Sequence, residues 1–209
     1  KGVLHTSSTL LNNVSPYAER LALGRDDIIF MASPMAHQTG FLYGMLMPIY
    51  LGASAVLQDV WDARTALKII AAERPTFTMA STPFLADLIE LAPEHRDALS
   101  SLRIFVSAGA PIPESLVEKA GNSLNAKIVS AWGMTETGAV TMTRPQDDPR
   151  RAIFTDGVAL PLVAVRVVDD AGLEIPAGSE GHLQVRGASL FVGCLKRPDL
   201  YSVDAQGWL

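Results

Sequence analysis

The stretch Lys127–Glu136, KIVSAWGMTE, joins a strand pattern to a turn with chemically distinctive side chains. Its first half, Lys127–Ala131, is rich in apolar and β-branched residues and is expected to form a strand. Its second half, Trp132–Glu136, brings together an aromatic ring, a glycine, a hydroxyl and a carboxylate. An earlier segment is organised in the same way, because the run Ile104–Ser107 passes into the turn Gly109-Ala110-Pro111. Repetition of this order favours parallel strands whose turns meet at one edge of a sheet.

The region up to residue 155 alternates strand and helix patterns throughout. The predicted strands are Ile28–Ala32, Ser54–Leu57, Phe77–Ser81, Ile104–Ser107 and Lys127–Ala131. The predicted helices are Ser8–Leu21, Gly40–Tyr50, Ala63–Glu73, Pro83–Leu91 and Glu114–Ser123. This alternation predicts an α/β fold with a mostly parallel, doubly wound sheet and helices on both faces. Ligands bind such sheets beyond the carboxyl ends of the strands, so the loops after Ser33, Ser81, Ser107 and Ala131 are the expected site.

The helix predicted at Ala63–Glu73 has clear start and stop signals. Leu67 and Ile70 fall on one face, as expected for an amphipathic helix. Asp62 is placed to cap its first turn, and Pro75 prevents its continuation.

The sequence after residue 155 has a different pattern, dominated by strands. Ala164–Val168 and Gly181–Arg186 are predicted strands, and the turn-forming residues 169–172 follow the first of them. We therefore predict an α/β domain at residues 1–155 and the beginning of a small β-barrel-like subdomain at residues 156–209. Both ends of the sequence are abrupt, so we expect the chain to be part of a longer protein.

The composition of the chain argues against several classes of function, including nucleic-acid binding. The net charge of −5 provides no basic surface for nucleic acid. The single cysteine, Cys194, is expected to be an inert packing residue, and its isolation fits a reducing, cytoplasmic setting. The uncharged stretch Ile28–Gln58 leaves a membrane span as an alternative, but Gly44, Pro48 and Gly52 interrupt it. We interpret it as a buried helix, a turn and a buried strand.

The two turns have both an ordinary and a functional interpretation. Gly109-Ala110-Pro111 could be a simple strand-to-helix turn, or its small side chains could let a flat ring approach the backbone. In Trp132–Gly138 the aromatic ring could stack on a base, Thr135 could bind a phosphate and Glu136 could hold Mg²⁺. The ordinary alternative is that Thr135 and Glu136 merely start a helix.

Four segments, taken in order, resemble the adenylate-forming superfamily, which comprises acyl-CoA synthetases, luciferases and the adenylation domains of peptide synthetases. The segments are Lys1-Gly2-Val3 with His5-Thr6, similar to the end of a Pro-Lys-Gly phosphate loop; Pro34–Gly40, similar to Pro-Leu-Phe-His-x-x-Gly; Ser130–Glu136, similar to Tyr/Trp-Gly-x-Thr-Glu; and Gly181–Gly187, similar to Gly-Glu-Leu-x-Val-Arg-Gly. The resemblance spans the whole chain. The departures are Cys194 for a tyrosine and His182 for a glutamate.

The resemblance implies roles for individual residues. Gly109, Ala110 and Pro111 would border the adenine of ATP, and Trp132 would stack on it or flank it. Thr135 would bind a nucleotide phosphate, Glu136 would coordinate Mg²⁺, and Lys1 would be the last charged residue of the phosphate loop. His37, Gly40 and Ser107 are implied at the acyl and thiol pocket. Gly133 and Met134 are implied at the nucleotide and would also line that pocket. The other histidines, His5, His95 and His182, show no ligand spacing and are interpreted as structural.

The reaction implied is the activation of a carboxylic acid by ATP, followed by transfer of the acyl group to coenzyme A. Pro34–Gly40 has no acidic residue to bind an amino group, and Phe41–Leu51 is apolar. These features favour an aliphatic or alicyclic acid. The alternatives are an acyl-AMP ligase, a peptide-synthetase-type adenylation domain, or a non-catalytic nucleotide-binding module. The family's ribose-binding Asp and C-terminal catalytic Lys lie outside the sequence, so we expect this chain alone to be inactive.

Overall fold

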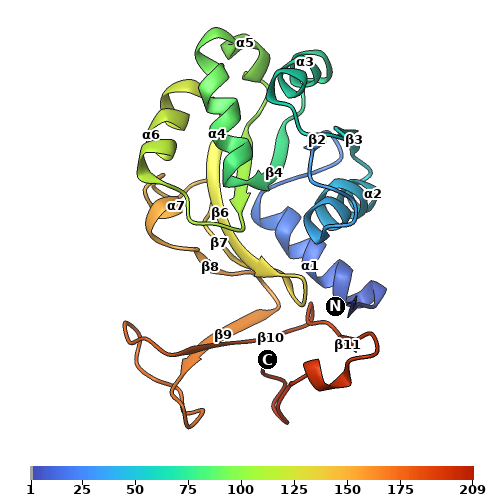
Figure 1. The fold of residues 1–209 in the computed structure, drawn as a ribbon, viewed down its shortest axis with the longest axis vertical. Helices are drawn as coiled ribbons and strands as arrows, with labels where there is room; N and C mark the ends of the chain where they lie inside the picture. Colours follow the sequence, from blue (N-terminus) through green and yellow to red (C-terminus); the bar gives the residue numbers. More distant parts are fainter. Residues whose placement is uncertain (1) are drawn as a thin grey trace.

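A seven-stranded sheet of order β3-β2-β4-β5-β6-β7-β8 forms the centre of the molecule (Figure 1). The computed structural model describes the backbone of residues 2–209 and, apart from Asn122, their side chains. The strands are β2 Ile28–Met31, β3 Ser54–Leu57, β4 Phe77–Ser81, β5 Ile104–Ala108, β6 Lys127–Met134, β7 Gly138–Met142 and β8 Val158–Ala159. Strands β2 to β6 are parallel, whereas β7 and β8 add to the sheet in antiparallel orientation. The predicted α/β fold is confirmed.

Helices cover both faces of this sheet (Figure 1). They are α1 Ser7–Arg20, the π-helix η1 Gly40–Leu46, α2 Met47–Leu51, α3 Ala63–Glu73, α4 Thr82–Leu91, η2 Ala92–Glu94, α5 Arg96–Leu99, α6 Glu114–Ser123, α7 Arg151–Phe154 and η3 Pro198–Leu200. The strand side chains alternate between two apolar cores: Ile29 and Met31 pack with α1, η1 and α2, while Phe30 packs with α3 to α6. This alternation is what a sheet buried on both faces requires.

The start and stop signals of α3 are confirmed. The Asp62 carboxylate accepts a hydrogen bond of 2.8 Å from the backbone N–H of Thr65. The helix ends at Glu73, and the next residue, Arg74, has a left-handed φ of 55° just before Pro75. The cap and the proline therefore set both boundaries of this element.

The segment Ile28–Gln58 differs from prediction in two respects. Strand β3 is not buried, because it is the edge strand of the sheet and Leu57 is 53% exposed. The helix expected at Gly40–Tyr50 is a π-helix that passes into α2, and Gly52, with a φ of 66°, follows the last residue of α2. Of the helices in residues 2–209, none is long and apolar enough to cross a bilayer.

The residues after Ala131 also differ from the prediction. Strand β6 does not stop there but continues to Met134 and turns back as β7, so Trp132 and Met134 are strand residues. Thr135 and Glu136 lie in the hairpin turn, and their interpretation as a helix start is wrong. The hairpin was missed because Gly133 and Gly138 resemble loop residues. A Cβ on Gly133 would lie 2.1 Å from the Gly138 carbonyl oxygen, so glycine allows the two strands to approach closely.

Short antiparallel pairs form the C-terminal part of the chain. Strand β9 Val163–Val168 pairs with β10 His182–Gly187, close to the predicted strands. The expected turn at residues 169–172 is present, and the Asp169 carboxylate accepts hydrogen bonds from two backbone N–H groups. Strand β1 Val3–Leu4 pairs with β11 Gly193–Cys194. The division of the chain at residue 155 stays a prediction, and β8 just beyond it belongs to the large sheet.

Candidate functional site

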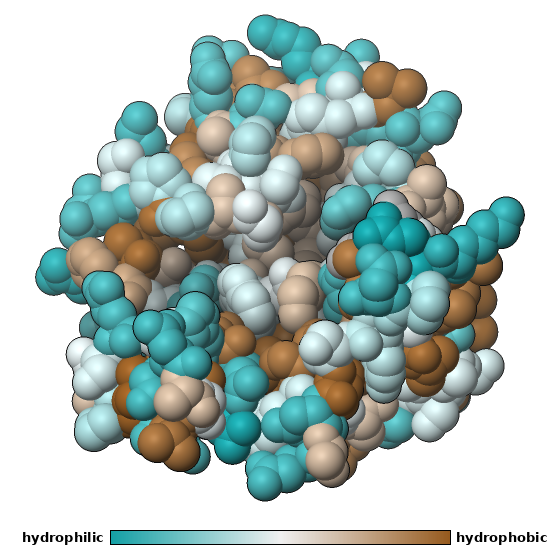
Figure 2. Space-filling view, turned by 60° about the horizontal axis from the view of Figure 1, so that its bottom comes forward, coloured by the Kyte–Doolittle hydropathy of each residue, from teal (hydrophilic) through white to brown (hydrophobic). Residues whose placement is uncertain are grey.

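A cavity of about 520 Å³ lies at the carboxyl ends of the parallel strands, where the sheet topology favours ligand binding. This end of the molecule is hollowed, with both hydrophilic and hydrophobic residues around the depression (Figure 2). All the loops that the sequence singled out contribute to it, through Ser33, Ser81, Ala108 and Ala131. The further lining residues are Pro34, His37, Gln38, Thr39, Tyr43, Met79, Ala80, Phe84, Gly109, Trp132, Gly133, Met134, Thr135, Glu136, Gly138 and Ala139. We call it the first cavity.

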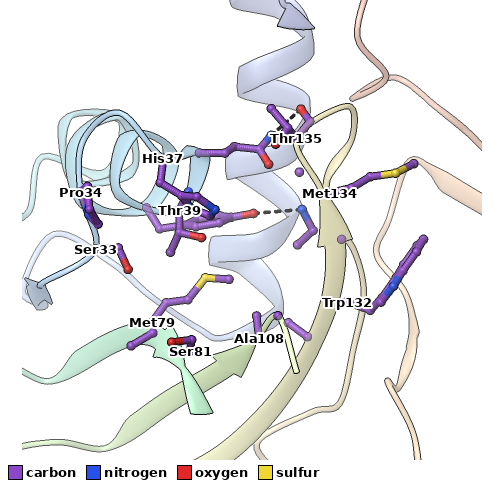
Figure 3. Close-up of a pocket in the computed structure, with 18 of the residues that line it drawn as sticks. Ser33, Pro34, His37, Thr39, Met79, Ser81, Ala108, Trp132, Met134 and Thr135 are labelled. Atoms are coloured by element: carbon purple, nitrogen blue, oxygen red, sulfur yellow. Dashed lines mark hydrogen bonds between the residues drawn. The ribbon is translucent and has the colours of Figure 1, made fainter. Parts of the chain in front are cut away.

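A second cavity of about 480 Å³ adjoins the first across the end of β6. The segments that line it are Gly109–Ile112, residues 130–133 and residues 152–156. Gly109, Ala110 and Pro111, implied to border adenine, are thus gathered here with Trp132. The side chains of Trp132 and Met134 leave β6 on the side away from His37 (Figure 3). The contribution of α7 and Asp156 was not foreseen, because nothing in their local sequence indicates a binding site.

The cavities share a wall made of Gly109, Ala131, Trp132 and Gly133. This shared wall brings the two predicted turns together, as expected from the parallel pairing of β5 and β6. The two cavities therefore meet at the carboxyl-terminal edge of the sheet. A molecule that occupied both of them would pass over the end of β6.

Gly40 and Ser107 lie behind the cavities rather than among the described residues that line them. Ser107 is buried, and its hydroxyl oxygen lies 3.2 Å from that of Thr82. Gly40 is also buried, and a Cβ there would lie 2.3 Å from the Pro34 carbonyl oxygen. Both residues support the loops that carry the lining side chains. Lys1 lies outside the described residues.

His37 lies on the loop between β2 and η1 and lines the first cavity. Its Nδ1 atom accepts a hydrogen bond of 3.1 Å from the backbone N–H of Thr39. Since a nitrogen that accepts cannot also carry the proton, the ring is neutral in this arrangement and Nε2 carries the hydrogen. His37 therefore offers one N–H donor.

The inner wall of the first cavity is fixed by a buried hydrogen-bond network. The Tyr43 hydroxyl donates to Oδ1 of Asn13 at 2.7 Å and accepts from the Ala139 N–H at 3.1 Å. Burial raises the pKa of Tyr43, so this hydroxyl stays protonated. The Tyr43 ring stacks on Tyr17, whose hydroxyl lies 3.1 Å from the sulfur of Met79. The wall is therefore uncharged and largely apolar.

The hairpin turn carrying Thr135 and Glu136 is held by distant parts of the chain. The Thr135 carbonyl accepts from Nε2 of His5 at 2.8 Å and from Nε2 of Gln38 at 3.0 Å. The Glu136 carbonyl accepts from the Phe191 N–H at 2.8 Å, and the Thr137 carbonyl from Nδ2 of Asn13 at 3.2 Å. Sequence reasoning missed His5, Gln38 and Asn13, since contacts over such separations leave no local pattern.

Among residues 2–209 there is no cluster of three or more His, Cys, Asp or Glu side chains that could hold a metal by itself. Glu136 is the only acidic residue among the described lining of the first cavity. A cation there would need most of its ligands from a bound molecule and from water.

The sequence model of the AMP-binding enzyme family matches residues 1–195. The chain belongs to this family. Its sequence is 33% identical to the medium-chain fatty-acid–CoA ligase of Escherichia coli strain K12, with all of the chain aligned to 37% of that enzyme.

Solved structures agree with this assignment. An ATP-bound chimera of RpMatB and BxBclM superimposes with a TM-score of 0.88 at 24% identity over the whole chain and 41% of the chimera, which shows the shared fold. A malonyl-CoA ligase in complex with methylmalonyl-CoA and AMP gives a TM-score of 0.87 at 25% identity, over the whole chain and 45% of the ligase. The family and fold inferred from the motifs are confirmed. The chain spans roughly two fifths of the length of these relatives.

Proposed function

We propose that this chain forms the nucleotide- and acid-binding part of an acyl-CoA ligase, which activates a carboxylic acid as its acyl adenylate and transfers the acyl group to coenzyme A. The observation that carries the proposal is the shared wall, which joins the two cavities at the end of β6, just before the turn that brings Thr135 and Glu136 to the first cavity. Support comes from the similar Escherichia coli enzyme, which is a medium-chain fatty-acid–CoA ligase.

The second cavity is the proposed place for the adenine. Gly109, Ala110 and Pro111 expose backbone rather than bulky side chains there, so a planar base can approach closely. Trp132 supplies a ring that can stack on the base or flank it. The α-phosphate would then lie near Gly133, between the two cavities.

The first cavity is the proposed place for the acid. Its volume of about 520 Å³ falls within the range of ligand pockets, and its inner wall of Tyr43, Met79 and Ala139 is uncharged. We therefore propose an aliphatic or alicyclic acyl group. A peptide-synthetase-type amino acid substrate is disfavoured, because Glu136 at the turn is the only carboxylate among the described lining residues.

The first chemical step brings two anions together, since the substrate carboxylate attacks the α-phosphorus of ATP and pyrophosphate leaves. Thr135 is exposed at the turn and can donate its hydroxyl hydrogen to a phosphate oxygen. His37 offers its Nε2–H at the mouth of the acid cavity, where it can bind the carboxylate or the incoming thiol. Both residues would favour the reaction by stabilising negative charge.

Mg²⁺ fits the donor set of this site. Magnesium is commonly bound through one or two carboxylates together with substrate phosphates, and Glu136 provides one carboxylate beside Thr135. We propose that Glu136 holds the ion jointly with ATP, and that the ion neutralises charge on the phosphates when bound.

In the second step a thiol displaces AMP to give a thioester. We propose coenzyme A as the thiol, and a carrier protein is the alternative acceptor. The buried, isolated Cys194 is compatible with the proposed cytoplasmic location.

The test is an assay of the longer polypeptide that we propose carries this chain. Acid-dependent release of pyrophosphate from ATP, and AMP formation that requires coenzyme A, are the expected results. Glu136→Gln should lower the rate of pyrophosphate release by about 100-fold or more, because it removes the carboxylate proposed to hold the Mg²⁺ that neutralises the phosphates. The matched control is Glu118→Gln on the exposed side of α6. Absence of acid-dependent pyrophosphate release with a broad set of carboxylic acids would contradict the proposal.

A further inference from the structure

The peptide between Thr135 and Glu136 is held from two sides at a single atom. Nε2 of His5, in the segment before α1, lies 2.8 Å from the Thr135 carbonyl oxygen. Nε2 of Gln38, in the loop after β2, donates to the same oxygen at 3.0 Å. A dashed line at Thr135 in Figure 3 marks a hydrogen bond of this turn. One carbonyl thus links the N-terminal segment to the loop that carries His37.

The chemistry of His5 makes its bond to Thr135 unambiguous. A carbonyl oxygen can only accept, so Nε2 must carry the hydrogen. In the neutral ring, Nδ1 then accepts from the Thr9 hydroxyl, which lies 3.0 Å away. If the ring is protonated, Nδ1 donates to Thr9 instead, and the Thr9 hydroxyl can turn to the Thr6 carbonyl at 3.0 Å. The bond to Thr135 exists in both states.

We propose that His5 and Gln38 are positioning residues for the adenylation step, acting together to orient the Thr135–Glu136 peptide. This inference rests on the proposed function of the site. The carbonyl of Thr135 and the nitrogen of Glu136 belong to one planar peptide unit. Holding that carbonyl therefore restrains the peptide plane and the two Cα atoms from which the Thr135 and Glu136 side chains leave the backbone. Neither donor needs to touch a substrate to affect the reaction.

Both hydrogen bonds lie at exposed atoms, which argues against a purely structural role. Water can replace an exposed donor, so the loss of either bond costs little folding stability. Water cannot hold the turn in one orientation, however, and a displacement of about 1 Å at a reacting group can cost about 100-fold in rate. Two donors on one acceptor also predict partial redundancy, since either one alone still restrains the carbonyl.

The experiment compares His5→Ala, Gln38→Met and the double variant in the longer polypeptide. Methionine preserves the length of the Gln38 side chain and removes its donor. We expect each single variant to lower kcat for pyrophosphate release by about threefold to fivefold, and the double variant by about 100-fold. The double loss should exceed the product of the single losses, with the KM for the acid and the thermal midpoint little changed.

His5→Gln supplies an amide donor of similar reach at position 5. Combined with Gln38→Met, it should recover most of the activity that the double variant His5→Ala, Gln38→Met loses. The matched controls are His182→Ala, an exposed histidine bonded to Asp170 at 2.9 Å, and Gln146→Met, an exposed glutamine. Both should retain wild-type kcat.

Amide hydrogen exchange over residues 133–139 provides a readout that does not depend on turnover. The double variant should exchange faster across this hairpin than the wild type, while α3 remains protected as before. Unchanged exchange at the turn, or a double variant within threefold of wild-type kcat, would overturn the inference. If the wild type itself releases no pyrophosphate, the proposed function fails, and the exchange experiment still decides whether His5 and Gln38 hold the turn.

Discussion

At the scale of single residues, the side chains of Thr135 and Glu136 could be assigned from sequence, whereas the groups that hold them could not. Their motif is local and chemically distinctive. His5 lies 130 positions from Thr135, and its contact depends on the pairing of the whole sheet. Gln38 next to His37 carried no signal of its own, because an amide side chain is common in any polar loop.

The shape of the hairpin depends on glycine at position 133. A Cβ there would lie 2.1 Å from the Gly138 carbonyl oxygen and 2.8 Å from the Ala139 Cα, both of which are backbone atoms that cannot rotate away. We expect Gly133→Ala to destabilise the fold by about 1–3 kcal/mol, as overpacking does, and to weaken ATP binding. Urea denaturation and a nucleotide titration measure the two effects.

The control for that substitution is Gly121→Ala in α6, where an added Cβ meets nothing within 4 Å. Alanine should there stabilise the helix by up to about 1 kcal/mol, because it is a better helix former than glycine. Equal effects of the two substitutions would show that close approach at Gly133 is unimportant.

The buried Tyr43 hydroxyl supports a second prediction. Tyr43→Phe removes the partner of the Asn13 Oδ1 atom and of the Ala139 N–H, both at buried positions. Leaving buried polar groups unpaired costs about 1–3 kcal/mol, so the free energy of unfolding should fall by that amount. Tyr50→Phe, which removes an exposed bond to Ser15, should change it by less than about 0.5 kcal/mol. Similar losses for the two variants would count against the network.

At the scale of elements, prediction succeeded where boundary signals are local and failed where pairing decides. Helix α3 could be placed from Asp62, Pro75 and its apolar face. Strands β7 and β8 were missed, because antiparallel neighbours joined by a glycine-containing hairpin do not follow the alternation of strand and helix. The exposure of β3 could not be foreseen either, since an edge position follows from strand order rather than from composition.

Asp27 joins several elements at the opposite end of the sheet from the cavities. Its carboxylate accepts from the Thr76 hydroxyl at 2.6 Å, the Gly24 N–H at 2.8 Å and the Arg103 guanidinium at 2.9 Å. Burial alone would raise the pKa of Asp27, but these hydrogen bonds outweigh it and hold the pKa below its usual value. The ionised form is therefore the one that stabilises the fold.

The pH dependence follows from the sign of that shift. A carboxyl group with a lowered folded pKa contributes stability above its unfolded value of about 3.9, and this contribution is lost as the pH falls through the folded value. Between pH 7 and pH 3 the wild type should therefore lose more free energy of unfolding than Asp27→Asn. Denaturant titrations at both pH values measure this difference, with Asp26→Asn at the exposed neighbouring position as the control. Parallel pH profiles for the wild type and Asp27→Asn would contradict it.

At the scale of the whole molecule, the sequence motifs identified the family, but they do not determine which steps of the reaction this chain performs alone. The relatives it matches are more than twice its length. Large apolar side chains also remain exposed on β3 and its surroundings, with Ile49 at 72% and Val60 at 75%. The cavities, by contrast, are formed within the described residues. We therefore expect this chain to bind ATP without catalysing the reaction of the longer enzyme.

We expect the isolated 209-residue chain to bind ATP in a Mg²⁺-dependent manner without catalysing acid-dependent pyrophosphate release. The cavity proposed for adenine and the Glu136 carboxylate both lie within the described residues. Calorimetric titration with ATP should show about 10–100-fold weaker binding for Glu136→Ala than for the wild type when Mg²⁺ is present, since a charged contact is worth about 1.5–3 kcal/mol. With EDTA in place of Mg²⁺ the two proteins should bind alike, because the carboxylate then has no cation to hold. Loss of affinity in EDTA as well would indicate that Glu136 supports the turn itself, and acid-dependent pyrophosphate release by the isolated chain would show that its own residues suffice for the reaction.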